Sequence, residues 1–176
     1  MPYAFFHERF PAISAKETRT LTAFNLPNLP AGEYGLFEMY CNEPGCDCRR
    51  VLFNVIEENS LDVKAVIGYG WESHAFYAHW LGRDDPEDIL EMQGPALNLM
   101  SRQSPLAPAL LKMMPVILSD TAYVERIKRH YAMFRTAIEQ EAGKQIRARS
   151  LTKLAEKRPK RPKPTKQKKS RRQKKK

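Results

Sequence analysis

The chain has 176 residues, of which 42% are hydrophobic and 28% charged, and its formal net charge is +10. Thirteen of the 30 Lys and Arg residues lie in residues 157–176, which hold no Asp or Glu, so residues 1–156 carry 17 basic against 20 acidic side chains. This mildly acidic body excludes a strongly basic groove on the fold itself, and no apolar run approaches the ~20 residues of a membrane-spanning helix.

Residues 1–16 show no clear hydrophobic period and are predicted to form an irregular lead-in to a single α+β domain over residues 17–156. Segments rich in β-branched and aromatic residues predict four strands. These strands are expected at residues 18–25, 34–41, 50–57 and 63–70. Their links are too short for crossover helices, which predicts an antiparallel meander.

From Trp71 onward the pattern becomes helical, over residues 71–81, 85–92 and 105–118. Pro108 and Pro115 should break or kink the last of these segments. Asp120 is the predicted N-cap of a long C-terminal helix, in which apolar residues recur at spacings of three and four. Strands first and helices after predict an α+β fold with the helices packed on one face of the sheet.

The three cysteines of the chain, Cys41, Cys46 and Cys48, all fall within the eight residues CNEPGCDC. Pro44 and Gly45 suit the central positions of a type II turn, which predicts a tight hairpin with Cys41 at the end of one strand. Cys46 and Cys48 are expected to open the next strand, with both side chains on one face. Converging thiolates favour a soft or borderline metal ion, and zinc is the predicted cofactor.

Structural zinc takes four ligands, and two histidines are candidates for the fourth. His74 follows the fourth strand at the end of the sheet where the third strand begins, and His130 flanks the apolar stripe of the long helix. Reduced thiols and a disulfide remain alternatives, and Arg49 and Arg50 beside Cys48 would lower a thiol pKa. The alternative function is therefore a metal-dependent or thiol redox enzyme at this cluster, although no set of catalytic residues accompanies it.

The run YCNEPGCDCRRV at Tyr40–Val51, with GWES at Gly70–Ser73, Phe76-Tyr77 and KRHY at Lys128–Tyr131, resembles a group of small uncharacterised bacterial proteins. The resemblance covers most of residues 17–138, and the Cys-Asp-Cys-Arg-Arg run is its most specific part. It implies a role for His130 and no catalytic residues. The basic tail lies outside it.

Residues 157–176 contain no apolar anchor, so a disordered tail is predicted, and their three prolines favour extended stretches. Counterion release predicts binding to nucleic acid without sequence preference. Of the two nucleic acids, RNA is the expected partner and DNA the alternative. The predicted contacts are Lys160, Arg161, Lys163, Lys166, Lys168, Lys169, Arg171 and Arg172. The predicted function is a zinc-stabilised module that binds nucleic acid through this tail. The N-terminus lacks the basic start of a signal peptide and the cysteine count is odd, so we expect a cytoplasmic protein.

Overall fold

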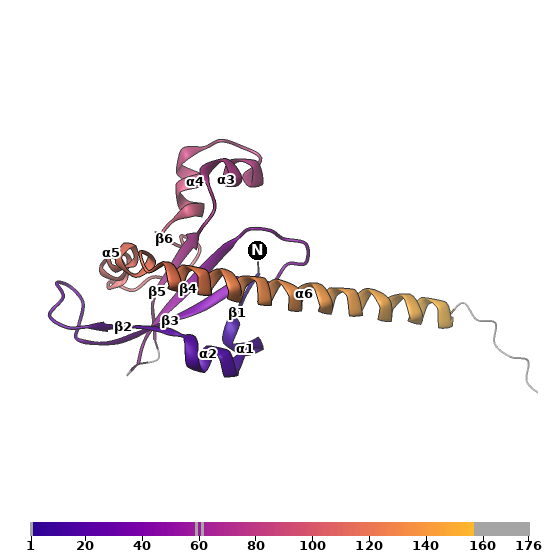
Figure 1. The fold of residues 1–176 in the computed structure, drawn as a ribbon, viewed down its shortest axis with the longest axis horizontal. Helices are drawn as coiled ribbons and strands as arrows, with labels where there is room; N and C mark the ends of the chain where they lie inside the picture. The colour runs from indigo at the N-terminus through magenta and orange to yellow at the C-terminus, as the bar shows by residue number, and fades with distance from the viewer. Residues whose placement is uncertain (1, 59, 61, 157–176) are drawn as a thin grey trace, which may run out of the picture. The chain divides into compact units, whose positions relative to one another are not determined.

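The computed structural model describes residues 2–58, 60 and 62–156 (Figure 1). One compact unit spans Met1–Ala142, and a second begins at Gly143. The basic tail and the eight residues predicted to contact nucleic acid lie outside the described residues, so both stay predictions.

Strands of the first unit form one antiparallel sheet (Figure 1). They are β1 (Tyr3–Phe5), β2 (Arg19–Ala23), β3 (Gly32–Cys41), β4 (Arg50–Glu57), β5 (Val63–Gly70) and β6 (Ala96–Leu97). Strands β2 to β5 pair consecutively, which confirms the predicted meander. The edge of β3 that pairs with β2 also pairs with β1, and β6 extends the sheet beyond β5.

The helices of the described residues complete the predicted α+β fold. They are α1 (Phe6–Arg9), α2 (Pro11–Glu17), α3 (His74–Leu81), α4 (Pro86–Gln93), α5 (Ala107–Leu118) and α6 (Thr121–Glu156). Asp120 caps the long helix as predicted, because its Oδ1 accepts a hydrogen bond of 3.2 Å from the Tyr123 backbone N–H. The expected break in α5 is wrong, and the alternative of a kink stays a prediction. Pro108 lies in the first turn, where a missing N–H costs nothing, and the helix continues through Pro115.

The N-terminal segment differs from the irregular lead-in that the sequence predicted. It forms β1, α1 and α2, and Tyr3, the first residue of β1, pairs with Cys41 of β3. Phe6 is buried and stacks on the ring of His130, with 4.2 Å between the two centroids. A segment held by such distant partners needs no hydrophobic period of its own, so its order was hidden from local sequence patterns.

Helices α5 and α6 cover one face of the sheet, where most of the core lies. Tyr40 of β3 contacts Phe134 of α6, and Phe53 of β4 stacks on Tyr123. Helix α4 contacts the opposite face, where the Arg50 guanidinium reaches across β5 and donates a 2.8 Å hydrogen bond to the Glu91 carbonyl. Gly68 makes this path possible, because a Cβ there would lie 2.2 Å from Arg50 Nη2.

Candidate metal centre

The cysteine loop, residues 42–49, connects the two central strands β3 and β4. The predicted turn is confirmed: the Cys46 N–H donates to the Glu43 carbonyl at 3.3 Å, and Gly45 takes a φ of 76°. The expectation that Cys46 and Cys48 open the next strand is wrong. Strand β4 begins only at Arg50, after Arg49 has turned the chain with a φ of 44°.

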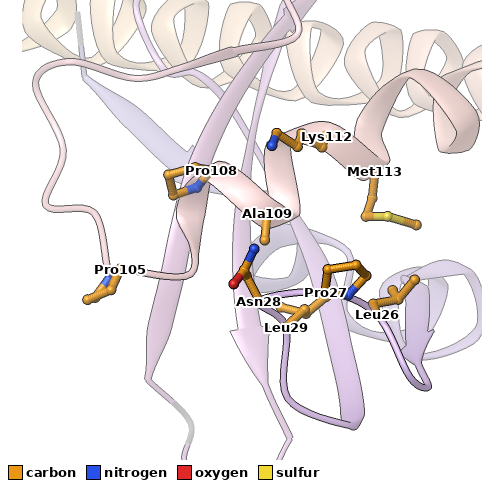
Figure 2. A pocket seen from close by; sticks show the side chains of 9 residues that line it. All are labelled: Leu26, Pro27, Asn28, Leu29, Pro105, Pro108, Ala109, Lys112 and Met113. Atoms are coloured by element: carbon orange, nitrogen blue, oxygen red, sulfur yellow. The ribbon is translucent and has the colours of Figure 1, made fainter.

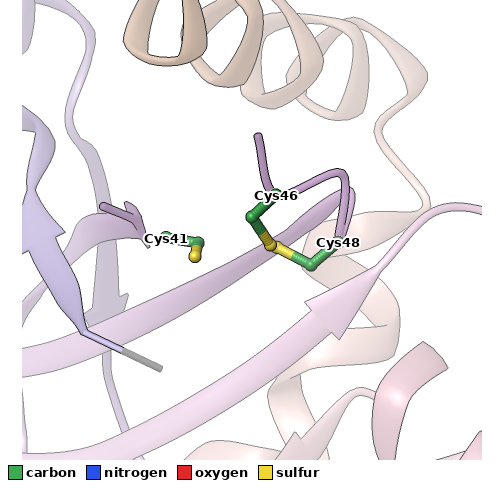
Figure 3. Close-up of side chains that lie close together, drawn as sticks. All are labelled: Cys41, Cys46 and Cys48. Atoms are coloured by element: carbon green, nitrogen blue, oxygen red, sulfur yellow. The ribbon is translucent and has the colours of Figure 1, made fainter. Parts of the chain in front are cut away.

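This irregular path brings the three thiol groups together, as Figure 3 shows. The sulfur atoms of Cys41, Cys46 and Cys48 all lie within 4.8 Å of one another, and no disulfide joins them. Zinc–sulfur bonds of about 2.3 Å in a tetrahedral site place sulfurs about 3.8 Å apart. Only small side-chain movements are therefore needed for all three sulfurs to bind one ion. Cys41 and Cys48 are buried, and Cys46 is half-exposed.

The pKa values of the three thiols are shifted in different directions. The hydrogen bond from Cys48 lowers the pKa of Cys41 to about 6, although burial of the side chain acts in the opposite direction. The same hydrogen bond raises the pKa of Cys48 far above its ordinary value, and burial raises the pKa of Cys46. The cluster thus holds one thiolate near neutral pH, supported by two thiol neighbours. A metal cation that displaces the thiol protons of Cys46 and Cys48 could bind all three sulfurs as thiolates.

Helix α6 clamps the backbone of the loop with two side chains spaced four residues apart. Arg135 donates from Nη1 to the carbonyls of Cys41 at 3.2 Å and Glu43 at 2.9 Å. Glu139 accepts a hydrogen bond of 2.7 Å from the Gly45 N–H. The charge of Arg135 also contributes to the lowered pKa of Cys41. Neither clamp residue was predicted, because only the folded position of α6 brings it to the loop.

Tyr3 and Arg50 border the cluster on the sheet. Tyr3 pairs with Cys41 in the β1–β3 register, so the two side chains leave the sheet on the same face. Met39 of β3 pairs with Leu52 of β4. Side chains two residues apart in a strand share a face, so Cys41, two residues after Met39, and Arg50, two residues before Leu52, lie on that face as well. Burial raises the pKa of the Tyr3 phenol, the three cysteines raise it further, and Arg50 lowers it. Tyr3 therefore stays protonated at neutral pH.

Among the described residues, neither predicted histidine joins the cysteines. His74 is exposed at the start of α3, where its Nε2 lies 3.4 Å from Asp84. His130 is buried with both ring nitrogens beside carboxylates: Nδ1 lies 2.7 Å from Glu38 and Nε2 lies 3.0 Å from Glu17. In this arrangement both histidine side chains bind acidic partners, so a histidine as fourth ligand stays a prediction.

The arginines that follow Cys48 differ from one another. Arg49 binds Asp47 through both carboxylate oxygens at 3.0 Å and Glu72 at 3.2 Å, so its charge is neutralised outside the cluster. Arg50 is buried, and its Nε has no hydrogen-bond partner. Within the described residues, the ion pairs include none from Arg50 to a carboxylate. A buried guanidinium of this kind calls for a nearby negative charge.

A separate hollow lies between the β2–β3 connection and α5 (Figure 2). Its volume is about 460 Å³, and its lining consists of Leu26, Pro27, Asn28, Leu29, Pro105, Pro108, Ala109, Lys112 and Met113. Apolar and proline side chains dominate, and Lys112 is the one ionisable group among these residues. No acid–base pair or metal-ligand set lines it, so the cysteine cluster is the stronger candidate site.

Comparisons with protein-family models, curated proteins and solved structures find no match. Of the helices in the described residues, none is both long and apolar enough to cross a membrane. The cysteine cluster and its charged surroundings are thus the features from which a function can be argued.

Proposed function

We propose that this chain is a zinc-stabilised binding module, with one zinc ion held by Cys41, Cys46 and Cys48. The observation that carries the proposal is the convergence of the three sulfurs, all within 4.8 Å of one another, from the end of β3 and the loop that follows it. Thiolates are the ligands that zinc and other soft or borderline ions prefer. The cross-link would join the end of β3 to the approach to β4 and hold the irregular backbone between them.

The charges around the cluster support a bound metal rather than three free thiols. Three thiolates on a Zn²⁺ ion carry one net negative charge. Arg135 lies beside the cluster and is already paired with Glu139, whereas Arg50 of β4 is buried without a carboxylate partner among the described residues. A metal–thiolate centre would provide the anion that Arg50 otherwise lacks.

The basic tail supplies the binding activity in this proposal. Thirteen cations in residues 157–176, with no acidic residue among them, favour contact with phosphates through counterion release. The tail has no aromatic residues to stack on bases, so we expect affinity without sequence preference, for RNA first and DNA second. Reduced thiols and this partner fit the cytoplasmic location that we expect.

A thiol redox function is the second candidate, and the lowered pKa of Cys41, about 6, is the observation that favours it. A reactive cysteine must also be accessible to its oxidant or substrate. Cys41 and Cys48 are buried, and only Cys46 of the three is half-exposed. Burial of the best nucleophile therefore makes metal binding the better-supported function.

Thermal unfolding of the full chain with and without a strong chelator tests the proposal. The chelated protein should melt at a lower temperature, and stoichiometric zinc should restore the original value. A matched measurement on the Cys46→Ser variant should show a low melting temperature that zinc no longer raises. If the chelator leaves the wild-type melting temperature unchanged, zinc stabilisation is contradicted. If instead the thiols of the native chain react rapidly with iodoacetamide, the redox candidate takes its place.

A further inference from the structure

The charge of the chain changes sign at Gly143, where the second unit begins. Residues 1–142 hold 13 basic and 19 acidic side chains, whereas residues 143–176 hold 17 basic side chains and one acidic one. The positive region therefore starts before the tail, within α6 and within the described part of the chain. We call residues 143–156 the basic arm. Its cations are Lys144, Arg147, Arg149 and Lys153.

Over residues 144–149, which the structure describes, the basic arm has no buried face. All six residues are exposed, and even Ile146 is 66% exposed. The ion pairs of the described residues include none from Arg147 or Arg149. Lys144 and Arg147 lie three residues apart, so they are neighbours on the helix and repel each other. An anionic partner would remove this repulsion, and the helix would gain stability from it.

The arginines of the basic arm lie on opposite sides of the helix. Successive residues of an α-helix advance by about 100°, so Arg147 and Arg149 are about 200° apart. Lys144 is on the side of Arg147, and the small side chain of Ala148 lies between the two arginines. A helix about 10–12 Å wide fits the major groove of DNA, which is about 12 Å wide. Cations on both flanks of such a helix would face the phosphates of both strands.

We propose that the basic arm lies in the major groove of double-stranded DNA, with Arg147 and Arg149 against the phosphates of opposite strands. This inference rests on the proposed nucleic-acid binding and narrows it for duplexes. Unpaired RNA stays the expected partner of the tail. Duplex RNA has a deep, narrow major groove that excludes the helix, so it contacts the tail alone. The arm adds to the tail and does not replace it, because its few cations release few counterions.

The first test compares DNA and RNA duplexes of one sequence, with affinities measured by fluorescence anisotropy of the full chain. Wild type should bind the DNA duplex about tenfold more tightly, because charge-assisted phosphate contacts are added there. A variant with both Arg147→Gln and Arg149→Gln should lose this preference, and its salt slope on DNA should become shallower by about two units. The matched control carries Arg102→Gln and Lys112→Gln. It loses two exposed cations of the body and should behave like wild type.

The second test separates the helix from its charge. Ala148→Pro breaks the helix and keeps every cation, so the DNA preference should disappear while the affinity for duplex RNA stays unchanged. Ala148→Ser is the matched control and should keep the preference. Residue 148 is exposed, so both variants should melt at the wild-type temperature. Dimethyl sulfate methylates guanine N7, which lies in the major groove, so wild type should protect this atom and Ala148→Pro should not.

The outcomes separate this inference from the proposed function. A full chain that binds no nucleic acid overturns both. Equal affinity for the two duplexes, or tighter binding to RNA, overturns the groove-binding arm alone. An unchanged DNA preference in Ala148→Pro also overturns it, because a flexible cationic segment would then be sufficient. Tight DNA binding that leaves guanine N7 unprotected would place the arm outside the major groove.

Discussion

The Nδ1 atom of His130 lies 2.7 Å from Oε2 of Glu38, and both side chains are buried between α6 and β3. The Tyr40 hydroxyl lies 2.7 Å from the same carboxylate oxygen, and the other ring nitrogen of His130 reaches Glu17 of α2. This network joins three elements that are distant in sequence. Because it occupies both nitrogens of the histidine, we assign His130 a structural role instead of a metal-binding one.

Replacing His130 with alanine is expected to lower the free energy of unfolding by about 3 kcal/mol, because it breaks the buried His130–Glu38 pair. Urea unfolding measures this change. His74→Ala is the matched control: that histidine is exposed, so its loss should change stability by no more than about 0.5 kcal/mol. Both variants should keep their zinc. Metal loss from either one would restore that histidine as a ligand.

Stability should depend on pH through Glu17. Its partial burial acts to raise its pKa, but the hydrogen bond to His130 and the charge of Arg129 lower that pKa below its ordinary value of 4.5. A lowered pKa in the folded state stabilises the protein above the unfolded value, and the contribution is lost as pH falls through the folded pKa. The stability difference between wild type and Glu17→Gln should thus be constant near pH 7 and shrink below about pH 4.5. A difference that grows with acidification would contradict this assignment.

The clamp from α6 should hold the metal loop in place. Arg135→Ala removes two hydrogen bonds to loop carbonyls and should cost about 1–2 kcal/mol of stability. It should also speed zinc transfer to a chelator. Arg135→Lys keeps the charge but cannot hold the two carbonyls through one nitrogen and Glu139 through another, and we expect an intermediate rate. The control is Arg147→Ala, on an exposed part of α6, which should release zinc at the wild-type rate. Equal rates in all four proteins would exclude a role for the clamp.

Nucleic-acid binding should reside in the tail. If about half of its cations meet phosphates, the logarithm of the affinity for duplex DNA should fall with the logarithm of salt concentration at a slope of about −6. Deleting residues 157–176 should abolish binding and leave the melting temperature unchanged. As a control for tail length, a variant with Gln at all Lys and Arg positions of the tail should behave like the deletion. A truncated chain that binds RNA or DNA with an unchanged salt slope would place the interface on the body.

Much of the sheet could be predicted, because alternating apolar residues and short connections specify strands locally. Strands β4 and β5 have the predicted bounds, and Pro44 and Gly45 form the predicted turn. The N-terminal elements could not be predicted in this way. They are fixed by contacts such as the Phe6–His130 stack, whose partners are separated by most of the domain.

The candidate site also combines features that are visible in the sequence with features that depend on the fold. Three cysteines in one short segment are visible in the sequence, and they converge as predicted. The surroundings of His130 could not be predicted, because a histidine's partners depend on tertiary contacts: Glu38 and Glu17 lie 92 and 113 residues from His130. Arg135 and Glu139 carry an ordinary helical spacing of four, which gives no sign that both reach the loop.

The metal content of the full chain, purified without added metal or chelator, tests the central claim most directly. Elemental analysis should give about one zinc per wild-type chain and a large loss in Cys41→Ser, Cys46→Ser and Cys48→Ser, since three ligands cannot be reduced to two without loss of affinity. His74→Ala and His130→Ala should retain the wild-type value. A metal-free wild-type protein with three titratable thiols would contradict the account.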